Sequence, residues 1–289
     1  MLNYNSTAEL RAFLDKEGLG MQKRFGQNFL INPQIRQTLA DQLDIKNGSE
    51  VWEIGPGLGA MTALLLEKGF TVNAFEIDKG FIRILKQMFA SVDRFRLFEG
   101  DVLKTWNKCE SNASFLLGNL PYNVASVLLA DLIENGKTFS RMVVTVQKEV
   151  ALRMAASAGS PDYSSFSVLC ASVYKVKPLM IIRPSSFYPQ PNVDSMGVLF
   201  EKKDSYEYPE IFYPLVRSLF ASRRKTVKNN LLTFLSGASS KLKSENDISC
   251  LCKEILYENA LNGSERAENL EIETFLSLAK TIDNMRLSK

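Results

Sequence analysis

The spacing of apolar positions changes along this chain, and the changes mark out its parts. Near the N-terminus, apolar side chains share one face of a helix predicted over residues 6–17, where Ser6 and Glu9 have the spacing of a capping box. A second helix is predicted from Ile35 to about Asn47. Both precede a region with a different period.

From residue 51 to residue 146, short apolar runs alternate with amphipathic stretches. The runs predict strands and the stretches predict helices. The predicted strands are Val51–Ile54, Thr71–Ile77, Phe95–Phe98, Phe115–Leu117 and Met142–Val146, and the predicted helices are Met61–Lys68, Phe81–Ala90 and Ala125–Glu134. Strands that alternate with helices form a mostly parallel sheet with right-handed crossovers.

Two later strands, Leu179–Ile182 and Met196–Phe200, are separated by a proline-rich loop instead of a helix. We therefore expect them to pair antiparallel at one edge of the sheet. After Lys203 the pattern is helical, with helices predicted over Ile211–Phe234, Ile248–Leu261 and Leu270–Ile282. The chain thus predicts an α/β domain over residues 1–203 and a small all-helical domain over residues 204–289.

The composition excludes several kinds of chemistry. The 289 residues contain no histidine, which excludes Ser-His-Asp hydrolysis and histidine metal sites. The four cysteines lack the paired spacing of metal ligands, so we predict no metal. A formal net charge of +3 means that affinity for an anion must come from local patches. No apolar run approaches the roughly 18 residues of a spanning helix, and no secretion signal is present, so we expect a cytoplasmic protein without a membrane partner.

Polar residues stand at the carboxyl ends of four successive predicted strands. The first strand runs into the glycine-rich turn Gly55–Gly59, which can approach a ligand closely. Glu76 ends the second strand, about 20 residues beyond the glycines. A carboxylate at this position can accept hydrogen bonds from both ribose hydroxyl groups. Asp101 follows the third strand and could accept from an adenine amino group. Alone, each could be an ordinary turn or a solvated acid; together they favour a ligand site at this edge of the sheet.

The fourth strand ends in Asn119-Leu120-Pro121-Tyr122. An amide, a rigid proline and an aromatic ring suit a flat ring that carries an amine, because the amide accepts hydrogen bonds and the tyrosine stacks. This favours chemistry on the exocyclic amino group of a base. Whether Asn119 alone holds the amine protons or shares them with the Leu120 carbonyl is open at this point.

Taken together, these motifs resemble the ribosomal RNA adenine dimethyltransferases from about residue 23 to the C-terminus. The resemblance is carried by Lys23–Leu30, Glu53–Gly57, Asn119–Asn123, Gln147–Val150 and Phe187–Ser195. Arg223–Thr226 and Arg266–Glu268 resemble the KsgA-type small-subunit branch and favour it over the erythromycin-resistance methylases, which act on the large subunit. The resemblance implies a Rossmann-like, seven-stranded class I methyltransferase sheet with S-adenosylmethionine as cofactor.

The resemblance also implies roles for individual residues. The implied cofactor contacts are Asn28, Leu30, Gly55, Gly57, Glu76, Ile77, Asp101, Val102 and Asn119. The implied catalytic residues are Asn119, Leu120, Tyr122 and Phe187, with Tyr122 and Phe187 on the two faces of a flipped adenine. The implied RNA contacts are Lys23, Arg24, Arg223, Arg224, Lys225 and Lys228. A charge run is usually a solvated helix face; with the resemblance we favour phosphate contact. Residues three or four apart share a helix face, so we expect Arg224 and Lys228 to act together.

The implied activity is dimethylation of the 6-amino groups of two adjacent adenosines near the 3′ end of small-subunit (16S) rRNA. The implied setting is a ribosomal subunit or an assembly intermediate, with a monomeric enzyme and a role in small-subunit biogenesis. The alternatives are a large-subunit methylase, a DNA adenine methylase and a non-catalytic assembly factor. The C-terminal Arg223–Thr226 motif argues against the first, and Leu120, where DNA enzymes more typically carry proline, argues against the second. Intact Asn119 and Glu76 argue against the third.

Overall fold

The structure is a computed structural model that describes residues 2–19, 27–204, 207–238 and 245–287. The chain divides into two compact units, residues 1–151 with 175–202 and residues 152–174 with 203–289. The hydrophobic pattern of the sequence predicts residues 152–174 as part of the first domain. They group with the helical unit because Tyr163 and Val168 are buried in its apolar core.

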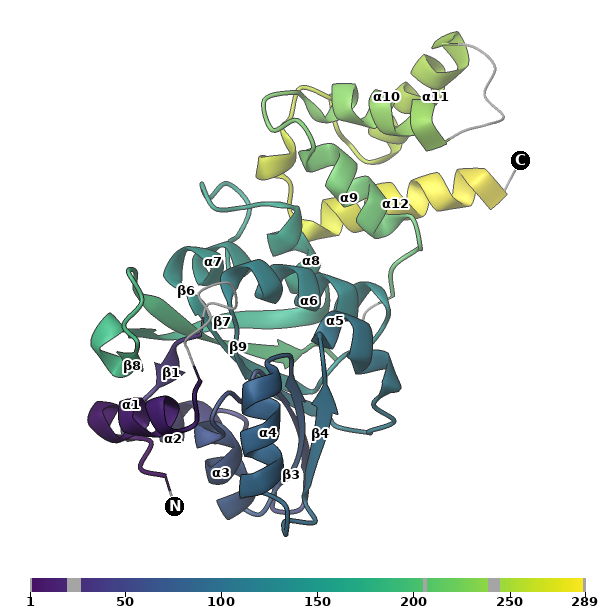
Figure 1. Cartoon of the computed structure of the whole chain (residues 1–289). Helices are drawn as coiled ribbons and strands as arrows, with labels where there is room; N and C mark the ends of the chain where they lie inside the picture. The colour runs from purple at the N-terminus through teal and green to yellow at the C-terminus, as the bar shows by residue number, and fades with distance from the viewer. Residues whose placement is uncertain (1, 20–26, 205–206, 239–244, 288–289) are drawn as a thin grey trace. The chain divides into compact units, whose positions relative to one another are not determined.

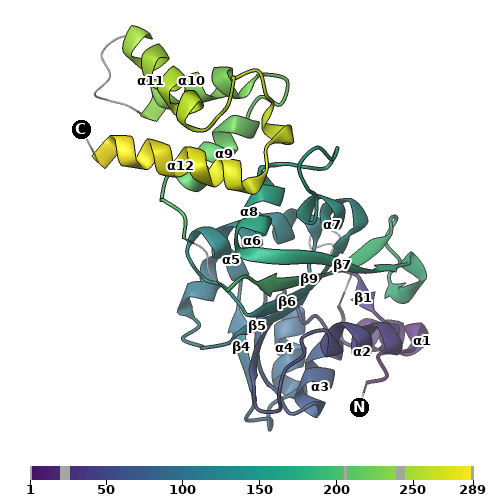
Figure 2. The same ribbon diagram turned by 180° about the vertical axis from the view of Figure 1, so that it is seen from behind.

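A seven-stranded sheet with helices on both faces is the centre of the first unit (Figures 1 and 2). Its strands are β2 (Glu50–Ile54), β3 (Thr71–Glu76), β4 (Phe95–Glu99), β5 (Phe115–Asn119), β6 (Arg141–Gln147), β7 (Tyr174–Ile182) and β9 (Ser195–Lys202). They lie in the order β4-β3-β2-β5-β6-β9-β7. Strands β2 to β6 pair parallel, and β9 runs antiparallel to β6. The mostly parallel sheet is therefore confirmed, and the two late strands lie side by side at one edge.

Most helices of this unit lie where they were predicted, but the helix predicted from Ile35 to about Asn47 ends at Asp41, and two short helices, Val102–Thr105 and Lys148–Met154, were not predicted. They are α1 (Thr7–Lys16), α2 (Pro33–Asp41), α3 (Ala60–Glu67), α4 (Lys79–Met88), the short α5 (Val102–Thr105), α6 (Tyr122–Glu134) and α7 (Lys148–Met154), which ends beyond the unit boundary. The side-chain oxygen of Ser6 caps α1 by accepting the N–H of Glu9 at 3.3 Å. Apolar residues of α2 and α3 share one core cluster with alternate residues of the strands, such as Val51 and Val72.

A small second sheet was not predicted. Strand β1 (Phe29–Leu30) pairs antiparallel with β8 (Phe187–Tyr188), with Leu30 opposite Phe187. Two-residue strands are too short to show a period in the sequence. This pairing fixes the N-terminal segment beside the loop that follows β7.

The helical unit contains α8 (Ser165–Val173), α9 (Phe212–Phe220), α10 (Val227–Ala238), α11 (Glu245–Glu258) and α12 (Ile272–Leu287) around one apolar core. The single helix predicted over 211–234 is two helices. The side-chain amide of Asn230 donates to the carbonyls of Leu219 at 2.8 Å and Ser222 at 3.3 Å, which satisfies the end of α9 where the chain turns. Arg224 lies in this turn and not on α10, so the expectation that Arg224 and Lys228 share one helix face is wrong. In the described ranges, no helix is long and apolar enough to cross a membrane.

Candidate active site

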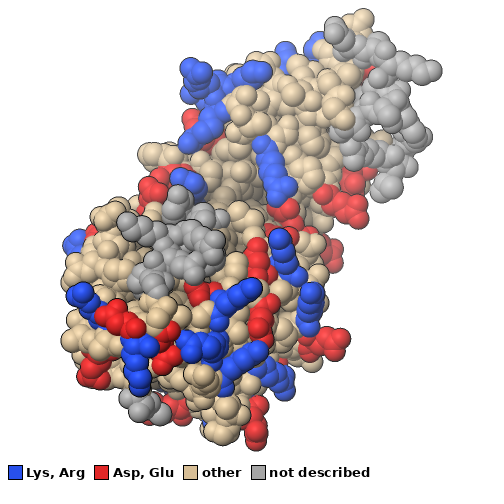
Figure 3. Space-filling model, in the orientation of Figure 1, with Lys and Arg blue, Asp and Glu red and all other residues tan. Residues whose placement is uncertain are grey.

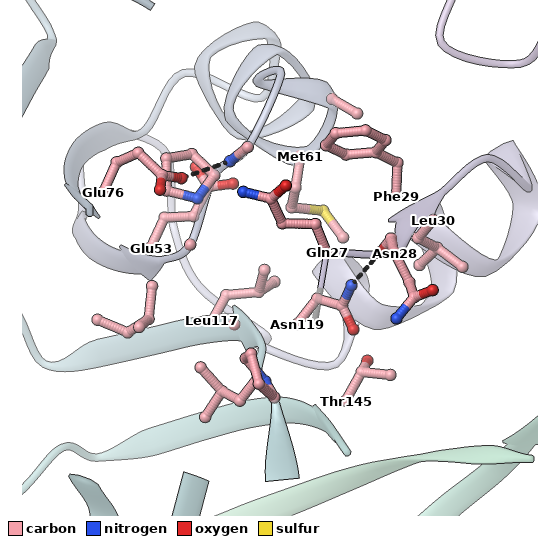
Figure 4. Close-up of a pocket in the computed structure, with 18 of the residues that line it drawn as sticks. Gln27, Asn28, Phe29, Leu30, Glu53, Met61, Glu76, Leu117, Asn119 and Thr145 are labelled. Carbon is pink, nitrogen blue, oxygen red and sulfur yellow. Dashed lines mark hydrogen bonds between the residues drawn. The ribbon is translucent and has the colours of Figure 1, made fainter. Parts of the chain in front are cut away.

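A cavity of about 700 Å³ opens at the carboxyl ends of the central strands (Figure 4). Its volume falls within the range of about 300–1,000 Å³ that small-molecule sites occupy. The predicted residues that line it are Asn28, Leu30, Gly55, Gly57, Glu76, Ile77, Asp101, Val102, Asn119, Leu120 and Phe187. Tyr122 is the first residue of α6, and its side chain lies outside the described part of the structure. The fold thus gathers residues from the carboxyl ends of four strands, β2 to β5, from β8 and from the N-terminal segment into one cavity.

The glycine turn between β2 and α3 forms one wall of this cavity. Gly55 and Gly57 have φ angles of 70° and 57°, in the left-handed region that favours glycine. A Cβ atom at Gly57 would also lie 2.9 Å from the ring of Phe29. The turn therefore requires glycine both for its backbone conformation and for the packing of the N-terminal segment across it.

Glu76 ties this turn to the end of β3. Its Oε2 accepts the N–H of Gly57 at 3.0 Å (dashed in Figure 4), and its Oε1 accepts the N–H groups of Ile77 at 2.9 Å and Asp78 at 2.8 Å. Burial raises the pKa of Glu76, although these three backbone donors oppose the rise. The carboxylate is therefore rigidly held at the point where a ribose is expected.

Glu53 is a second buried carboxyl group in the cavity wall. The hydroxyl of Thr62 donates to its Oε2 at 2.7 Å. Burial, and secondarily the negative charge of Glu76, raises the pKa of Glu53 to about 8. A cationic group placed beside Glu53 would favour its ionised form, so this site suits an ammonium group.

The raised pKa of Glu53 predicts a pH-dependent stability. The folded protein keeps a proton on Glu53 that the unfolded chain releases above its ordinary pKa of 4.5, so stability is lost as pH rises from 4.5 to about 8. The free energy of unfolding should fall by up to about 1.4 kcal/mol per pH unit in this window. Urea denaturation at several pH values should show this fall in the wild type and a shallower one in Glu53→Gln. Identical slopes in the two proteins would contradict the assignment.

Asn119 ends β5 and projects into the cavity. Its Nδ2 donates to the main-chain carbonyl of Asn28 at 2.8 Å, as Figure 4 shows. This bond fixes the orientation of the amide and leaves Oδ1 as the acceptor that remains for a ligand. The sequence placed both residues at the site but could not show that the N-terminal segment orients the Asn119 amide.

The remaining predicted residues have more local partners. Asp101 caps α5, with its Oδ1 accepting the N–H of Leu103 at 3.1 Å, and Val102 behind it is buried. Ile77 is 43% exposed, so its side chain is accessible to a ligand. Phe187 lines the cavity but is only 2% exposed, because β8 packs it against β1. Its role in stacking stays a prediction.

The predicted RNA contacts differ in availability. Arg223 forms an ion pair with Glu268 at 3.1 Å and donates to the carbonyl of Pro161 at 3.2 Å. Arg224, Lys225 and Lys228 are exposed where α9 passes into α10, an end of the helical unit at which Figure 3 shows Lys and Arg gathered. Lys23 and Arg24 lie outside the described residues.

The cavity also contains residues that the sequence analysis did not select, among them Tyr4, Gln27 and Arg36. The Gln27 amide donates to Asp78 Oδ2 at 3.0 Å, which anchors the N-terminal segment to the start of α4. The sequence does indicate that Arg36 is buried, since its spacing places it on the same face of α2 as Leu39 and Ala40, which are buried. A charged side chain on an apolar helix face is buried with the apolar ones and therefore needs polar partners inside the protein.

Comparison with known proteins decides the family. The sequence model of one protein family, ribosomal RNA adenine dimethylase, matches residues 18–283 of the chain. The protein belongs to this family. It is 46% identical to the ribosomal RNA small subunit methyltransferase A of Treponema denticola, over 98% of this chain and 97% of that protein. It is 40% identical to the protein of the same name from Treponema pallidum, over 97% of each chain.

A solved structure shows the same fold. The crystal structure of a dimethyladenosine transferase from Plasmodium falciparum matches with a TM-score of 0.76 and 26% identity, over 88% of this chain and 96% of that one. These comparisons confirm the class I methyltransferase fold, the methyltransferase activity and S-adenosylmethionine as the cofactor of this rRNA adenine dimethylase. The cavity fits this cofactor, since a Cβ atom at Gly55 would have only the Asn119 carbonyl within 4.0 Å, so the backbone is open to a ligand there, and buried carboxyl groups are available for the ribose and the ammonium group.

Proposed function

We propose that this protein dimethylates the 6-amino groups of two adjacent adenosines near the 3′ end of small-subunit rRNA. The observation that carries the proposal is the Asn119 amide, oriented by Asn28 and placed in the same cavity as Glu53, Glu76 and Asp101. The names of the relatives, small subunit methyltransferase A, support the choice of RNA.

The residues around Asn119 account for the chemistry. S-adenosylmethionine, when bound, supplies a methyl group on a positively charged sulfur. The adenine amino nitrogen is a weak nucleophile because its lone pair delocalises into the ring. Asn119 Oδ1 and the Leu120 carbonyl accept hydrogen bonds from its two N–H groups and favour a pyramidal nitrogen, while Pro121 fixes the backbone between them. Positioning and oriented dipoles then provide most of the catalysis, and no imidazole is needed.

The second transfer places a different demand on these groups. A monomethylated amine keeps one proton, so one acceptor is enough to hold it, and the other side of the nitrogen must accommodate a methyl group. The target base must also leave its stack, at a cost of a few kcal/mol, which aromatic stacking by Tyr122 and Phe187 offsets by about 1–3 kcal/mol. We place these events on RNA within a ribosomal subunit or an assembly intermediate, carried out by a monomer in the cytoplasm.

Labelled methyl transfer tests the choice of substrate. Purified protein with labelled S-adenosylmethionine should methylate small subunits from a strain that lacks this modification. Large subunits from the same strain are the matched control and should remain unlabelled. Label in large-subunit RNA alone would overturn the proposal and favour the large-subunit alternative.

The exposed basic residues after α9 predict the salt dependence of RNA binding. Alanine at Arg224 or Lys225 should weaken binding to small-subunit rRNA and lower the slope of log affinity against log salt by about 1 each. Arg11, exposed on α1, provides the control. Its replacement also removes a surface positive charge, which pairs with Asp15, but Arg11 belongs to the other unit of the chain. Slopes equal to that of the wild type would show that these residues do not contact phosphate.

A further inference from the structure

The cavity contains a buried arginine without an acidic partner. Arg36 is 7% exposed, and in the described part of the chain no carboxylate lies within 4.0 Å of its guanidinium. Its Nη1 donates to the carbonyl of Leu30 at 2.6 Å and its Nη2 to Asn5 Oδ1 at 2.5 Å. A buried charge held only by neutral groups is costly. The guanidinium has five N–H donors, so these two bonds leave donors for an anion.

A buried hydroxyl accompanies this arginine. The Tyr4 hydroxyl is enclosed and has no hydrogen-bond partner among the described residues. The pKa of Tyr4 is raised by burial and by the negative charge of Glu53, and it is lowered by Arg36, so the phenol lies within electrostatic range of both groups. Tyr4, Arg36 and Glu53 all line the cavity.

The charges of the cavity are unequal. Its described lining contains three acids, Glu53, Glu76 and Asp101, and Arg36 is the basic residue among them. S-adenosylmethionine carries two positive charges, on its sulfonium and ammonium groups, and one negative charge on its carboxylate. The ammonium and the carboxylate are bonded to the same carbon atom, so their partners must lie in one cavity, as Glu53 and Arg36 do.

We infer that Arg36, with the Tyr4 hydroxyl, forms the subsite for the carboxylate of the amino-acid tail of the cofactor, opposite Glu53, which receives the ammonium group. Asn5 and the Leu30 carbonyl orient the guanidinium. The N-terminal residues before α1 thus take part in cofactor binding. The inference rests on S-adenosylmethionine being the cofactor and is independent of the RNA substrate.

Calorimetry with two ligands tests this subsite without RNA and without turnover. Wild-type protein should bind S-adenosylhomocysteine roughly tenfold to a hundredfold more tightly than decarboxylated S-adenosylhomocysteine, which lacks only the carboxylate. Arg36→Met should bind both ligands with the weak affinity of the decarboxylated one. Tyr4→Phe, a milder change that keeps the ring, should lower the affinity for S-adenosylhomocysteine severalfold and leave the affinity for the decarboxylated ligand unchanged.

Arg94→Met is the matched control, because Arg94 also donates to a main-chain carbonyl, that of Phe70, but lies outside the cavity. It should leave both affinities unchanged. Equal weakening of both ligands by Arg36→Met would show a merely structural role and overturn the assignment. Equal affinity of wild-type protein for the two ligands would overturn it as well, even if Arg36→Met failed to fold. If the wild-type protein did not bind S-adenosylhomocysteine at all, the methyltransferase function itself would be contradicted. This outcome differs from equal binding of the two ligands, which would overturn only the carboxylate subsite.

Discussion

Replacing Asn119 with alanine should lower methyl transfer by roughly 10²- to 10³-fold, the loss typical when one preorganised hydrogen-bonding group is removed from a reacting centre. The change removes the Oδ1 acceptor of the target amine and the bond to the Asn28 carbonyl. Since Asn119 is exposed at the end of β5, the thermal unfolding midpoint should change little. Single-turnover rates with saturating cofactor and small subunits measure the effect.

Asn135→Ala is the control for this experiment. Its side chain also makes an amide-to-carbonyl bond, donating to Asp131 O at 2.8 Å at the end of α6, but it does not line the cavity. It should retain the wild-type rate. The rate that remains in Asn119→Ala measures the contribution of the Leu120 carbonyl and of base stacking. A fully active Asn119→Ala protein would refute the mechanism.

Replacing Glu76 with alanine should cost both stability and cofactor binding. Three backbone N–H groups, of Gly57, Ile77 and Asp78, would lose their acceptor. A buried donor left unpaired costs about 1–3 kcal/mol; the bond from Asp78 is buried and the other two are part-buried, so the unfolding free energy should fall by about 1–3 kcal/mol. The glycine turn would lose its connection to β3, and the ribose would lose its acceptor. Thermal unfolding and calorimetry with S-adenosylhomocysteine measure the two losses.

Glu99→Ala separates this effect from a general change in charge. Glu99 ends the neighbouring strand β4 in register with Glu76, but it is exposed and forms a surface ion pair with Lys86. Exposed pairs contribute little, so this variant should behave almost as the wild type. Wild-type stability and affinity in Glu76→Ala would show that neither the turn nor the ribose depends on this carboxylate.

The regular elements of the first unit were predictable because each has a clear period. The apolar run at β3, for example, stands between Gly69 and α4, which the side chain of Asp78 caps, so sequence and structure agree within a few residues. The two-residue strands β1 and β8 have no period, and their pairing depends on tertiary contact between Leu30 and Phe187. The division of the predicted 211–234 helix depends likewise on the side chain of Asn230.

The site shows the same limit. The sequence placed Glu76, Asp101 and Asn119 correctly at one edge of the sheet because the carboxyl ends of parallel strands meet there. It could not show that Asn119 is oriented by a main-chain carbonyl, because a carbonyl group leaves no trace in residue identity. Nor could it show that Arg36 and Tyr4 line the same cavity as Glu53, since α1 and α2 are placed by their packing.

The N-terminal segment therefore contributes to the site at several points. Gln27 anchors it to Asp78, the Asn28 carbonyl orients Asn119, and Phe29 packs on the glycine turn. These contacts connect the start of α4 and the glycine turn to the Asn119 amide. If Asn119 holds the target amine as proposed, binding of the cofactor and orientation of this amide are linked through a few adjacent residues.

Whether the protein dimethylates adenine in small-subunit rRNA can be read from the identity of the product. Unmethylated small subunits are incubated with the protein and S-adenosylmethionine, and the nucleosides of their RNA are separated by mass spectrometry over time. N6-methyladenosine should appear first and be converted to N6,N6-dimethyladenosine. Methylation of another base, or a product that stops at the monomethyl stage, would contradict the proposed dimethylation.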